Sequence, residues 1–388
     1  MSKILLVDTN RASYTIYQSL LTQGHHVFVV GGNSDEPLAK ICPNFIQLDY
    51  SDACVLDAFI EQEGFDFIVP GCTDVSYNSC AEVNRRRFPG IDSVESTRRI
   101  NDKAEFRRLA GEIGIPVPRV VRFDEALHCD AVIVKPVDAF SGRGITIVKE
   151  PDRDCLQAAY SLGCEASKSR TALIEEFVSG QLYSHSAFLL AGKVVADFVV
   201  QEDCTTNLFT VDTSKVLFDF PEKLRESLRL DASKLFDSLG LVDGLIHSQF
   251  ILSGDRYWII EVTRRCPGDL YALLIEMSTG YPYGASYAAS FLGKEPMPQN
   301  AGTLQKRIIR HTATSKDGDY LWGFSFKQPV NLKFFVPLAT AGDFMKPSPY
   351  GRAGLFFLEA QSDKAQELLY ESLLADSLYS FNFAKPIE

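Results

Sequence analysis

Three features are scarce in this chain of 388 residues: long apolar runs, excess positive charge and patterned cysteines. No apolar run approaches the roughly 20 residues of a membrane helix, and "ILLV" before Asp8 is too short for a signal-peptide core. The formal net charge of −11 opposes a nucleic-acid surface, because phosphate backbones are bound by concentrated Lys and Arg. We therefore expect a cytoplasmic protein with no membrane or nucleic-acid partner.

The nine cysteines form no CxxC pair, and no histidine stands at zinc-ligand spacing from them. We interpret them as reduced thiols. Cys266 follows two arginines, which would favour a nucleophile by lowering its pKa, but a buried inert thiol is the more common outcome. The dinucleotide fingerprint GxGxxG is missing too, since only "GGN" follows the strand-like run "HVFVV".

The first part of the chain alternates strand-like and helix-like segments. Short apolar runs such as "KILLVD", "HVFVV" and "FDFIVPG" are separated by amphipathic stretches over residues 13–22 and 53–62. This alternation is typical of βαβ units and predicts a parallel sheet that binds ligands near the C-terminal ends of its strands. We assign residues 1–96 to a parallel-sheet domain of the α/β class.

The pattern changes after about residue 97. Asn101 or Asp102 caps a helix that ends at Gly114, and the prolines that follow prevent it from continuing. Several β-rich hairpins come next, with turns expected at Gly192 and at residues 253–255.

We assign residues 97–295 to a second domain and residues 296–388 to an α+β part of the same large unit. The last predicted helix carries Leu369, Leu373 and Leu374 on one face.

Four short pieces contain residues suited to nucleotide and metal chemistry. The first is Lys135 at a strand end, followed by a loop with Gly142 and Gly144, whose backbone N–H groups can approach a phosphate. The second is Lys103 in the capped helix. A solvated lysine and an ordinary hairpin tip are the simpler alternatives for both.

The third piece is "LIEEFVSG". A strand with unpaired backbone groups can bond the edge of an adenine, and the Glu176 carbonyl and the Val178 amide are suitably placed. An ordinary edge strand is the alternative.

The fourth piece is a hairpin that pairs "HSQF" with "RYWIIEVTRRCPGD". It places Gln249 and Glu261 on adjacent strands, and oxygen ligands converging in this way, completed by phosphates, are typical of Mg²⁺ sites. Glu261 lies in a strand whose sequence predicts burial and is soon followed by Arg264 and Arg265, so we expect it to be paired with a cation, protonated or bound to a metal ion. A structural Glu–Arg pair is the alternative.

In this order and at these separations, the four pieces resemble an ATP-grasp enzyme over nearly the whole chain. The resemblance implies a Rossmann-like leading domain, an ATP-grasp fold with a lid over about residues 118–180, and a β-rich C-terminal segment. Carried over by position, it implies ATP-phosphate contacts at Lys103 and Lys135, a phosphate loop, adenine contacts at Glu176 and Val178, and Mg²⁺ or Mn²⁺ held by Gln249 and Glu261. The loop consists of Ser141, Gly142, Arg143 and Gly144.

Two positions depart from the family pattern. Leu182 stands where the family has a ribose-binding Glu, so Glu175 or Gln181 would take over that contact. Thr263 replaces the usual Asn of the metal motif, whereas Gln249 is familiar from the carbamoyl-phosphate-synthetase branch.

The resemblance also implies roles for the two arginines. Arg265 would stabilise charge on the transferred phosphoryl group, and Arg264 would clamp a substrate carboxylate. Glu261 would be buried because Mg²⁺ and ATP compensate its charge. No general base is evident; His185 and His247 are candidates, although a structural role is more common for such residues.

The implied activity is that of a carboxylate–amine ligase. ATP converts a carboxylate to an acyl phosphate, an amine displaces the phosphate, and ADP is released. The alternatives are a bicarbonate-activating carboxylase or carbamoyl-phosphate-type enzyme, and a degenerate module that binds nucleotide without turnover. The partners would be a small carboxylate and a small amine, with a homodimer left open. The sequence does not identify either substrate.

Overall fold

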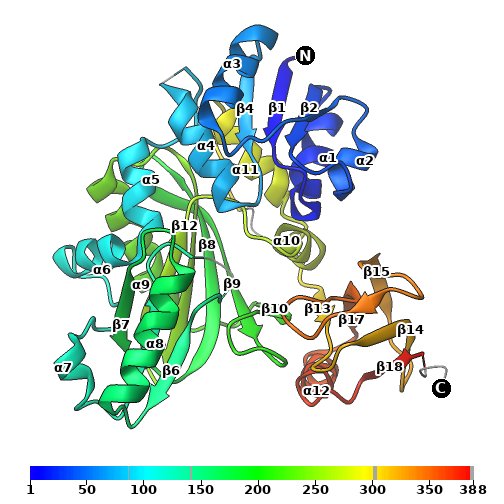
Figure 1. Ribbon diagram of the computed structural model, residues 1–388. Coiled ribbons are helices and arrows are strands. Elements are labelled where there is room, and N and C mark those ends of the chain that lie inside the picture. The colour runs from blue at the N-terminus through cyan, green and yellow to red at the C-terminus, as the bar shows by residue number, and fades with distance from the viewer. Residues whose placement is uncertain (86, 140–141, 300–303, 385–388) are drawn as a thin grey trace.

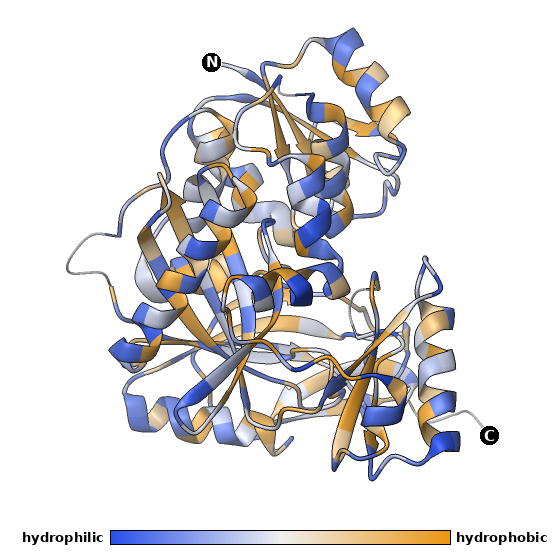
Figure 2. Ribbon diagram, turned by 90° about the vertical axis from the view of Figure 1, so that its left-hand side faces the viewer, coloured by the Kyte–Doolittle hydropathy of each residue, from blue (hydrophilic) through white to orange (hydrophobic). Residues whose placement is uncertain are grey.

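The computed structural model describes residues 1–85, 87–139, 142–299 and 304–384. The N-terminal region forms the expected parallel sheet, with strand order β3-β2-β1-β4 (Figure 1). Figure 2 shows that the strands of this sheet are almost uniformly hydrophobic, as expected for a sheet that is covered on both faces. The elements of this region are β1 (Lys3–Val7), η1 (Arg11–Ser13), α1 (Tyr14–Thr22), β2 (His26–Gly31), α2 (Pro37–Ile41), β3 (Phe45–Gln47), α3 (Ala53–Glu63), β4 (Phe67–Pro70) and α4 (Asp74–Asn84).

A largely antiparallel sheet of eight strands, in the order β12-β11-β8-β9-β10-β13-β17-β15, forms the centre of the molecule (Figure 1). Strand β13 pairs with β10, so the C-terminal region continues this sheet. The strands are β8 (Gln181–Leu190), β9 (Lys193–Asp203), β10 (Thr213–Leu217), β11 (Gly244–Ser253), β12 (Arg256–Thr263), β13 (Arg307–Ala313), β15 (Leu332–Pro337) and β17 (Gly354–Ala360).

A small sheet of three strands, β6-β5-β7, stands apart from the large sheet and has its own hydrophobic core. That core includes Val132, Val134, Leu156 and Ile174. A subdomain with a separate core can move as a unit. It contains α7 (Phe123–Ala126), β5 (Ala131–Pro136), β6 (Thr146–Lys149), α8 (Arg153–Ala166) and β7 (Ala172–Glu176).

Two hydrophobic cores cover opposite faces of the large sheet. One extends from Ile4 and Tyr17 of the parallel domain to Phe198 and Leu245 of the sheet, and so joins the two domains. The other packs the sheet against α6 and α9. The helices around the sheet are α5 (Val94–Asn101), α6 (Lys103–Glu112), α9 (Glu222–Leu239), α10 (Tyr271–Thr279) and α11 (Tyr283–Phe291).

The C-terminal region adds a third small sheet, β16-β14-β18, and a final helix. Leu373 of this helix is buried, but Leu374 is exposed, so Leu374 does not belong to the buried face of the helix as we expected. The elements are β14 (Asp319–Phe326), β16 (Phe344–Met345), α12 (Asp363–Leu374) and β18 (Tyr379–Phe383).

The α/β class, the parallel sheet and both hairpin turns are confirmed. Strands β8 and β9 meet at Ala191 and Gly192, and β11 and β12 meet at Gly254 and Asp255. Within the described residues, no helix is both long and apolar enough to span a membrane.

Candidate active site

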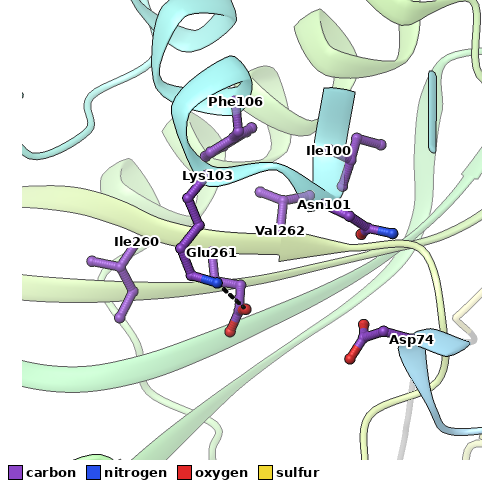
Figure 3. Close-up of a pocket in the computed structure, with 8 residues that line it drawn as sticks. All are labelled: Asp74, Ile100, Asn101, Lys103, Phe106, Ile260, Glu261 and Val262. Atoms are coloured by element: carbon purple, nitrogen blue, oxygen red, sulfur yellow. Dashed lines mark ion pairs between the residues drawn. The ribbon is translucent and has the colours of Figure 1, made fainter. Parts of the chain in front are cut away.

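A pocket between the parallel domain and the edge of the large sheet contains two of the predicted residues (Figure 3). Lys103 opens α6, whose N-terminus is capped by the Asp102 side chain. The Lys103 Nζ donates to the Ala139 carbonyl at 3.0 Å and lies 3.9 Å from Glu261 Oε1. The pocket is lined by Asp74, Ile100, Asn101, Lys103, Phe106, Ile260, Glu261 and Val262.

Glu261 lies opposite Gln249 in the β11–β12 register, so the expected pairing of these two residues is confirmed. The expectation that Glu261 is buried is wrong, because 45% of its side chain is exposed. Strand β12 is the edge strand of the sheet, which leaves this carboxylate open to the pocket.

Lys135 is buried in an ion-pair network that the sequence did not indicate. Its Nζ lies 2.8 Å from Glu175 Oε2, while Arg107 Nε lies 2.5 Å from Glu175 Oε1. Arg107 also donates to the Ile260 carbonyl at 2.7 Å, which ties α6, β7 and β12 together. Burial opposes ionisation of Glu175, but Lys135 and Arg107 outweigh it and lower the Glu175 pKa.

Glu175 is therefore not a ribose contact. Its side chain has no exposed surface, and both carboxylate oxygens are occupied by cations. Gln181, the other candidate, donates to the Glu202 carbonyl at 2.9 Å and to Asp203 Oδ1 at 3.1 Å.

Contacts within the protein already occupy part of the segment at the end of β7, where we expected adenine to bind. The Glu176 amide donates to the Arg119 carbonyl at 2.9 Å, and the Glu176 carboxylate pairs with the exposed Arg119 side chain at 2.5 Å. Residues 119–121 thus cover part of the strand edge. The adenine contacts of the Glu176 carbonyl and of Val178, which follows the strand end, remain predictions.

The glycine loop has the backbone conformation that requires glycine. Gly142 and Gly144 both have φ of +71°, and a Cβ at either position would collide with Phe209 or Ala166. Arg143 between them is exposed, whereas Ser141 lies outside the described residues. Phosphate binding by this loop remains a prediction.

A buried carboxylate beside the predicted metal ligands was missed. Glu202 on β9 is 4% exposed, and its Oε2 accepts a hydrogen bond of 2.7 Å from Gln249 Nε2. Burial raises the Glu202 pKa, and the Glu261 charge raises it further. The polar run "QED" at the end of an apolar strand was the available signal.

The donors of this region fit a Mg²⁺ ion that is held together with nucleotide phosphates. With its NH₂ group bound to Glu202, Gln249 keeps its carbonyl oxygen as a possible ligand beside Glu261. No group of three or more His, Cys, Asp or Glu side chains in the described part of the chain could hold a metal ion by itself. Phosphate and water oxygens would have to complete the coordination.

Arg264 is not a substrate clamp. It is 4% exposed, its Nε lies 2.6 Å from Asp92 Oδ2, and its Nη atoms donate to the carbonyls of Val242 and Leu245. Burial opposes its charge, but Asp92 outweighs burial and raises the Arg264 pKa. Arg264 therefore holds the segment after β12 in place.

Arg265 lies beside the pocket and is paired across the domain boundary. Its Nε and Nη2 lie 2.7 Å and 3.1 Å from the two carboxylate oxygens of Asp74, and Nη1 donates to the Cys266 carbonyl at 3.3 Å. Burial would lower the Arg265 pKa, but Asp74 and Glu261 raise it. The guanidinium therefore stays charged.

Cys266 and His247 are both buried. Cys266 is fully buried, and burial raises the pKa of its thiol, so the nucleophile alternative is wrong. Burial lowers the pKa of His247 to about 3, and its Nδ1 bonds Ser186 Oγ at 2.9 Å. His185 is buried against Asp197 at 3.2 Å, which is a structural arrangement.

Three arginines from distant parts of the chain surround Asp269, a cluster that the sequence did not indicate. Arg352 Nη1 lies 2.7 Å from Asp269 Oδ1, and Arg310 Nη1 donates to the Asp269 carbonyl at 2.9 Å. Arg11 is close enough that its charge, with the other two, lowers the Asp269 pKa against the effect of burial. Arg352 thus pairs with the carboxylate, Arg310 binds the backbone carbonyl, and Arg11 acts through its charge.

The middle of the chain matches a known domain family. Residues 100–269 match the family model described as the ATP-grasp domain.

Among known proteins, the chain is 25% identical over 320 residues to a formate-dependent phosphoribosylglycinamide formyltransferase from Azotobacter vinelandii, covering 76% of this chain and 77% of the relative. An L-amino acid ligase from Bacillus licheniformis has a similar fold, with a TM-score of 0.76 at 16% identity over 99% of both chains. A biotin carboxylase from Campylobacter jejuni has a TM-score of 0.72 at 16% identity, covering 98% of this chain and 92% of that one. The two structural likenesses concern the fold alone.

Proposed function

We propose that this protein is an ADP-forming ligase that activates a carboxylate with ATP and joins it to an amine. The observation that carries the proposal is the pocket lined by Lys103, Glu261 and Asp74, whose carboxylate pairs with Arg265. It combines cations for phosphate, oxygen ligands for a metal ion and a fixed guanidinium, which together suit phosphoryl transfer.

The nucleotide would lie between the lid and the large sheet. Lys103 and Lys135 would bind its phosphates, and the loop of residues 142–144 would cover them. Mg²⁺ would be held by Glu261 and the Gln249 carbonyl oxygen, with Mn²⁺ as the alternative ion. Bound ATP would supply the phosphoryl group that turns the carboxylate into an acyl phosphate.

The chain's own residues would do three things in this reaction. Arg265 would bind the charge that develops on the transferred phosphoryl group. Lys135 pairs with Glu175, which also pairs with Arg107, and these contacts would hold the lysine side chain in one position. The subdomain of residues 118–180, with its separate core, would exclude water from the hydrolysable intermediate as a lid.

The arginine cluster around Asp269 supports an anionic substrate. The summed positive charge of Arg11, Arg310 and Arg352 exceeds the negative charge of Asp269. Guanidinium groups that are partly removed from water favour binding of a carboxylate or phosphate through two hydrogen bonds. The name of the formyltransferase relative contains a phosphoribosyl group. We therefore propose that one substrate carries a carboxylate or phosphate that this cluster binds.

The test is an ADP-release screen with Mg·ATP, a panel of carboxylates and a panel of amines. The carboxylates include formate, bicarbonate and amino acids, and hydroxylamine serves as a trapping amine. The proposal expects ADP only when a carboxylate is present, and a hydroxamate when hydroxylamine is added. A Lys135→Ala variant is the control for contaminating ATPase. ADP formed with bicarbonate alone would favour the carboxylase alternative.

A nucleotide-binding module without turnover is the second candidate. The departures at Leu182 and Thr263 favour it, because the family's ribose and metal positions are both altered. Tight Mg·ATP binding with no ADP across the full panel would support this candidate over the ligase. We further propose a cytoplasmic location, and a homodimer remains open to test by light scattering.

A further inference from the structure

The Asp74–Arg265 pair connects the parallel domain to the predicted phosphoryl site. Asp74 is the first residue of α4, directly after Thr73, whose side chain caps the helix by accepting from the Ser76 amide. The cap fixes the backbone at Asp74. Its carboxylate lines the same pocket as Lys103 and Glu261 (Figure 3).

The geometry of the pair restricts how Arg265 can point. Asp74 accepts from Nε and Nη2, and the Cys266 carbonyl accepts from Nη1. A guanidinium has five N–H groups, so these contacts use three and leave one on each Nη atom. The Arg265 side chain is 20% exposed and that of Asp74 is 12% exposed, so the pair is only weakly screened by solvent.

A second carboxylate competes for the same guanidinium. Glu261 is close enough to Arg265 for its charge to act on it, and 45% of the Glu261 side chain is exposed. Without Asp74, Arg265 would be drawn toward Glu261 and would neutralise the predicted metal ligand. With Asp74 present, the guanidinium pairs with the Asp74 carboxylate instead.

We infer that Asp74 is a positioning residue: it holds Arg265 so that the remaining N–H groups meet the terminal phosphate of ATP, and it keeps Arg265 away from Glu261. This inference rests on the proposed role of Arg265 in the ligase. It means that the parallel domain, which has no nucleotide motif of its own, acts on the chemistry through one carboxylate.

The test measures the contribution of the terminal phosphate without needing the unknown substrates. Affinities for the Mg²⁺ complexes of β,γ-methylene-ATP and of ADP are compared by calorimetry in the full-length protein. In Arg265→Ala, the preference for the triphosphate should fall about 10-fold or more, the loss expected for one charge-assisted contact. Asp74→Asn should lower the preference to a similar extent, while ADP affinity stays near that of the wild type.

Two controls separate positioning from general damage. Asp57→Asn breaks the ion pairs of Asp57 with Arg85, at 3.0 Å, and with Arg87 in the same domain, and it should leave the preference unchanged. Asp74→Asn in the Arg265→Ala background should add no further loss. If Asp74→Asn does not fold, Asp74→Glu, which keeps the charge, serves as the second variant and should show a smaller loss.

The outcomes distinguish the two proposals. A lower preference in Arg265→Ala but not in the Asp74 variants overturns the inference and leaves the role of Arg265 intact. An unchanged preference in Arg265→Ala refutes the role of Arg265, and the inference falls with it. Equal and non-additive losses support both.

Discussion

Glu175 is the position where an amide substitution should be most costly, and its neighbour Glu176 provides the matched control. The Glu175 side chain has no exposed surface, and its partners Arg107 and Lys135 are only 2% and 9% exposed. Glu176 pairs with Arg119, but these side chains are 42% and 57% exposed. The same substitution, Glu to Gln, thus tests a buried and a solvated ion pair in adjacent residues.

The expected difference follows from desolvation. Glu175→Gln leaves two buried cations facing one amide, whose NH₂ group must point at one of them, and breaking a buried pair in this way costs roughly 3–5 kcal/mol. Glu176→Gln removes a solvent-exposed pair, so its effect on the free energy of unfolding should be much smaller. Burial lowers the Lys135 pKa and the Glu175 charge raises it, so Glu175→Gln should leave Lys135 less protonated and thereby weaken Mg·ATP binding.

The measurement is urea unfolding followed by circular dichroism, together with hydrogen exchange of the β5 and β7 amides and calorimetry with Mg·ATP. Equal unfolding free energies for the two variants would refute the reasoning that Glu175 is held by two desolvated cations. Unchanged ATP affinity in Glu175→Gln would refute the link between this network and phosphate binding.

Further predictions concern the phosphate lysines, the metal site and pH. Lys103→Ala and Lys135→Ala should each weaken Mg·ATP binding about 10-fold or more, and unchanged calorimetric affinity in both would remove the phosphate assignment. Mg²⁺ should bind essentially as the ATP complex, and Glu261→Gln should cost more activity than Gln249→Ala; tight Mg²⁺ binding to the nucleotide-free protein would contradict this placement of the site. Burial lowers the pKa of His311 to about 4 from its usual 6.5, so the stability it contributes is complete above pH 6.5 and is lost as pH falls through 4. Between pH 8 and 5, His311→Gln should lose less stability to urea than the wild type, by roughly 2 kcal/mol, while the loss caused by His247 remains in both proteins; parallel pH curves for the two proteins would contradict the prediction.

Local patterns in the sequence determined the helices and strands and the order in which the site residues follow one another along the chain. Apolar runs separated by amphipathic stretches were sufficient for the parallel sheet, and Asp102 and Gly192 marked a helix start and a hairpin turn because capping and turn chemistry act over a few residues. The pairing of Gln249 with Glu261 needed more than the length of the hairpin, because a β-bulge between Gln249 and Phe250 shifts the register by one residue and brings these two side chains opposite each other. The ordered set of weak motifs was enough to identify the ATP-grasp class.

Only the tertiary structure decided which charged side chain meets which. Arg264 and Arg265 are neighbours of the same type, yet Arg264 pairs with Asp92 and Arg265 pairs with Asp74, which lines the pocket, because adjacent side chains leave the backbone in different directions. Glu175 and Glu176 differ in the same way between core and solvent. Arg107, Glu202 and the arginines around Asp269 come from segments far apart in the chain, and burial and pairing over such separations depend on how the sheets and domains pack. No local spacing carries that information.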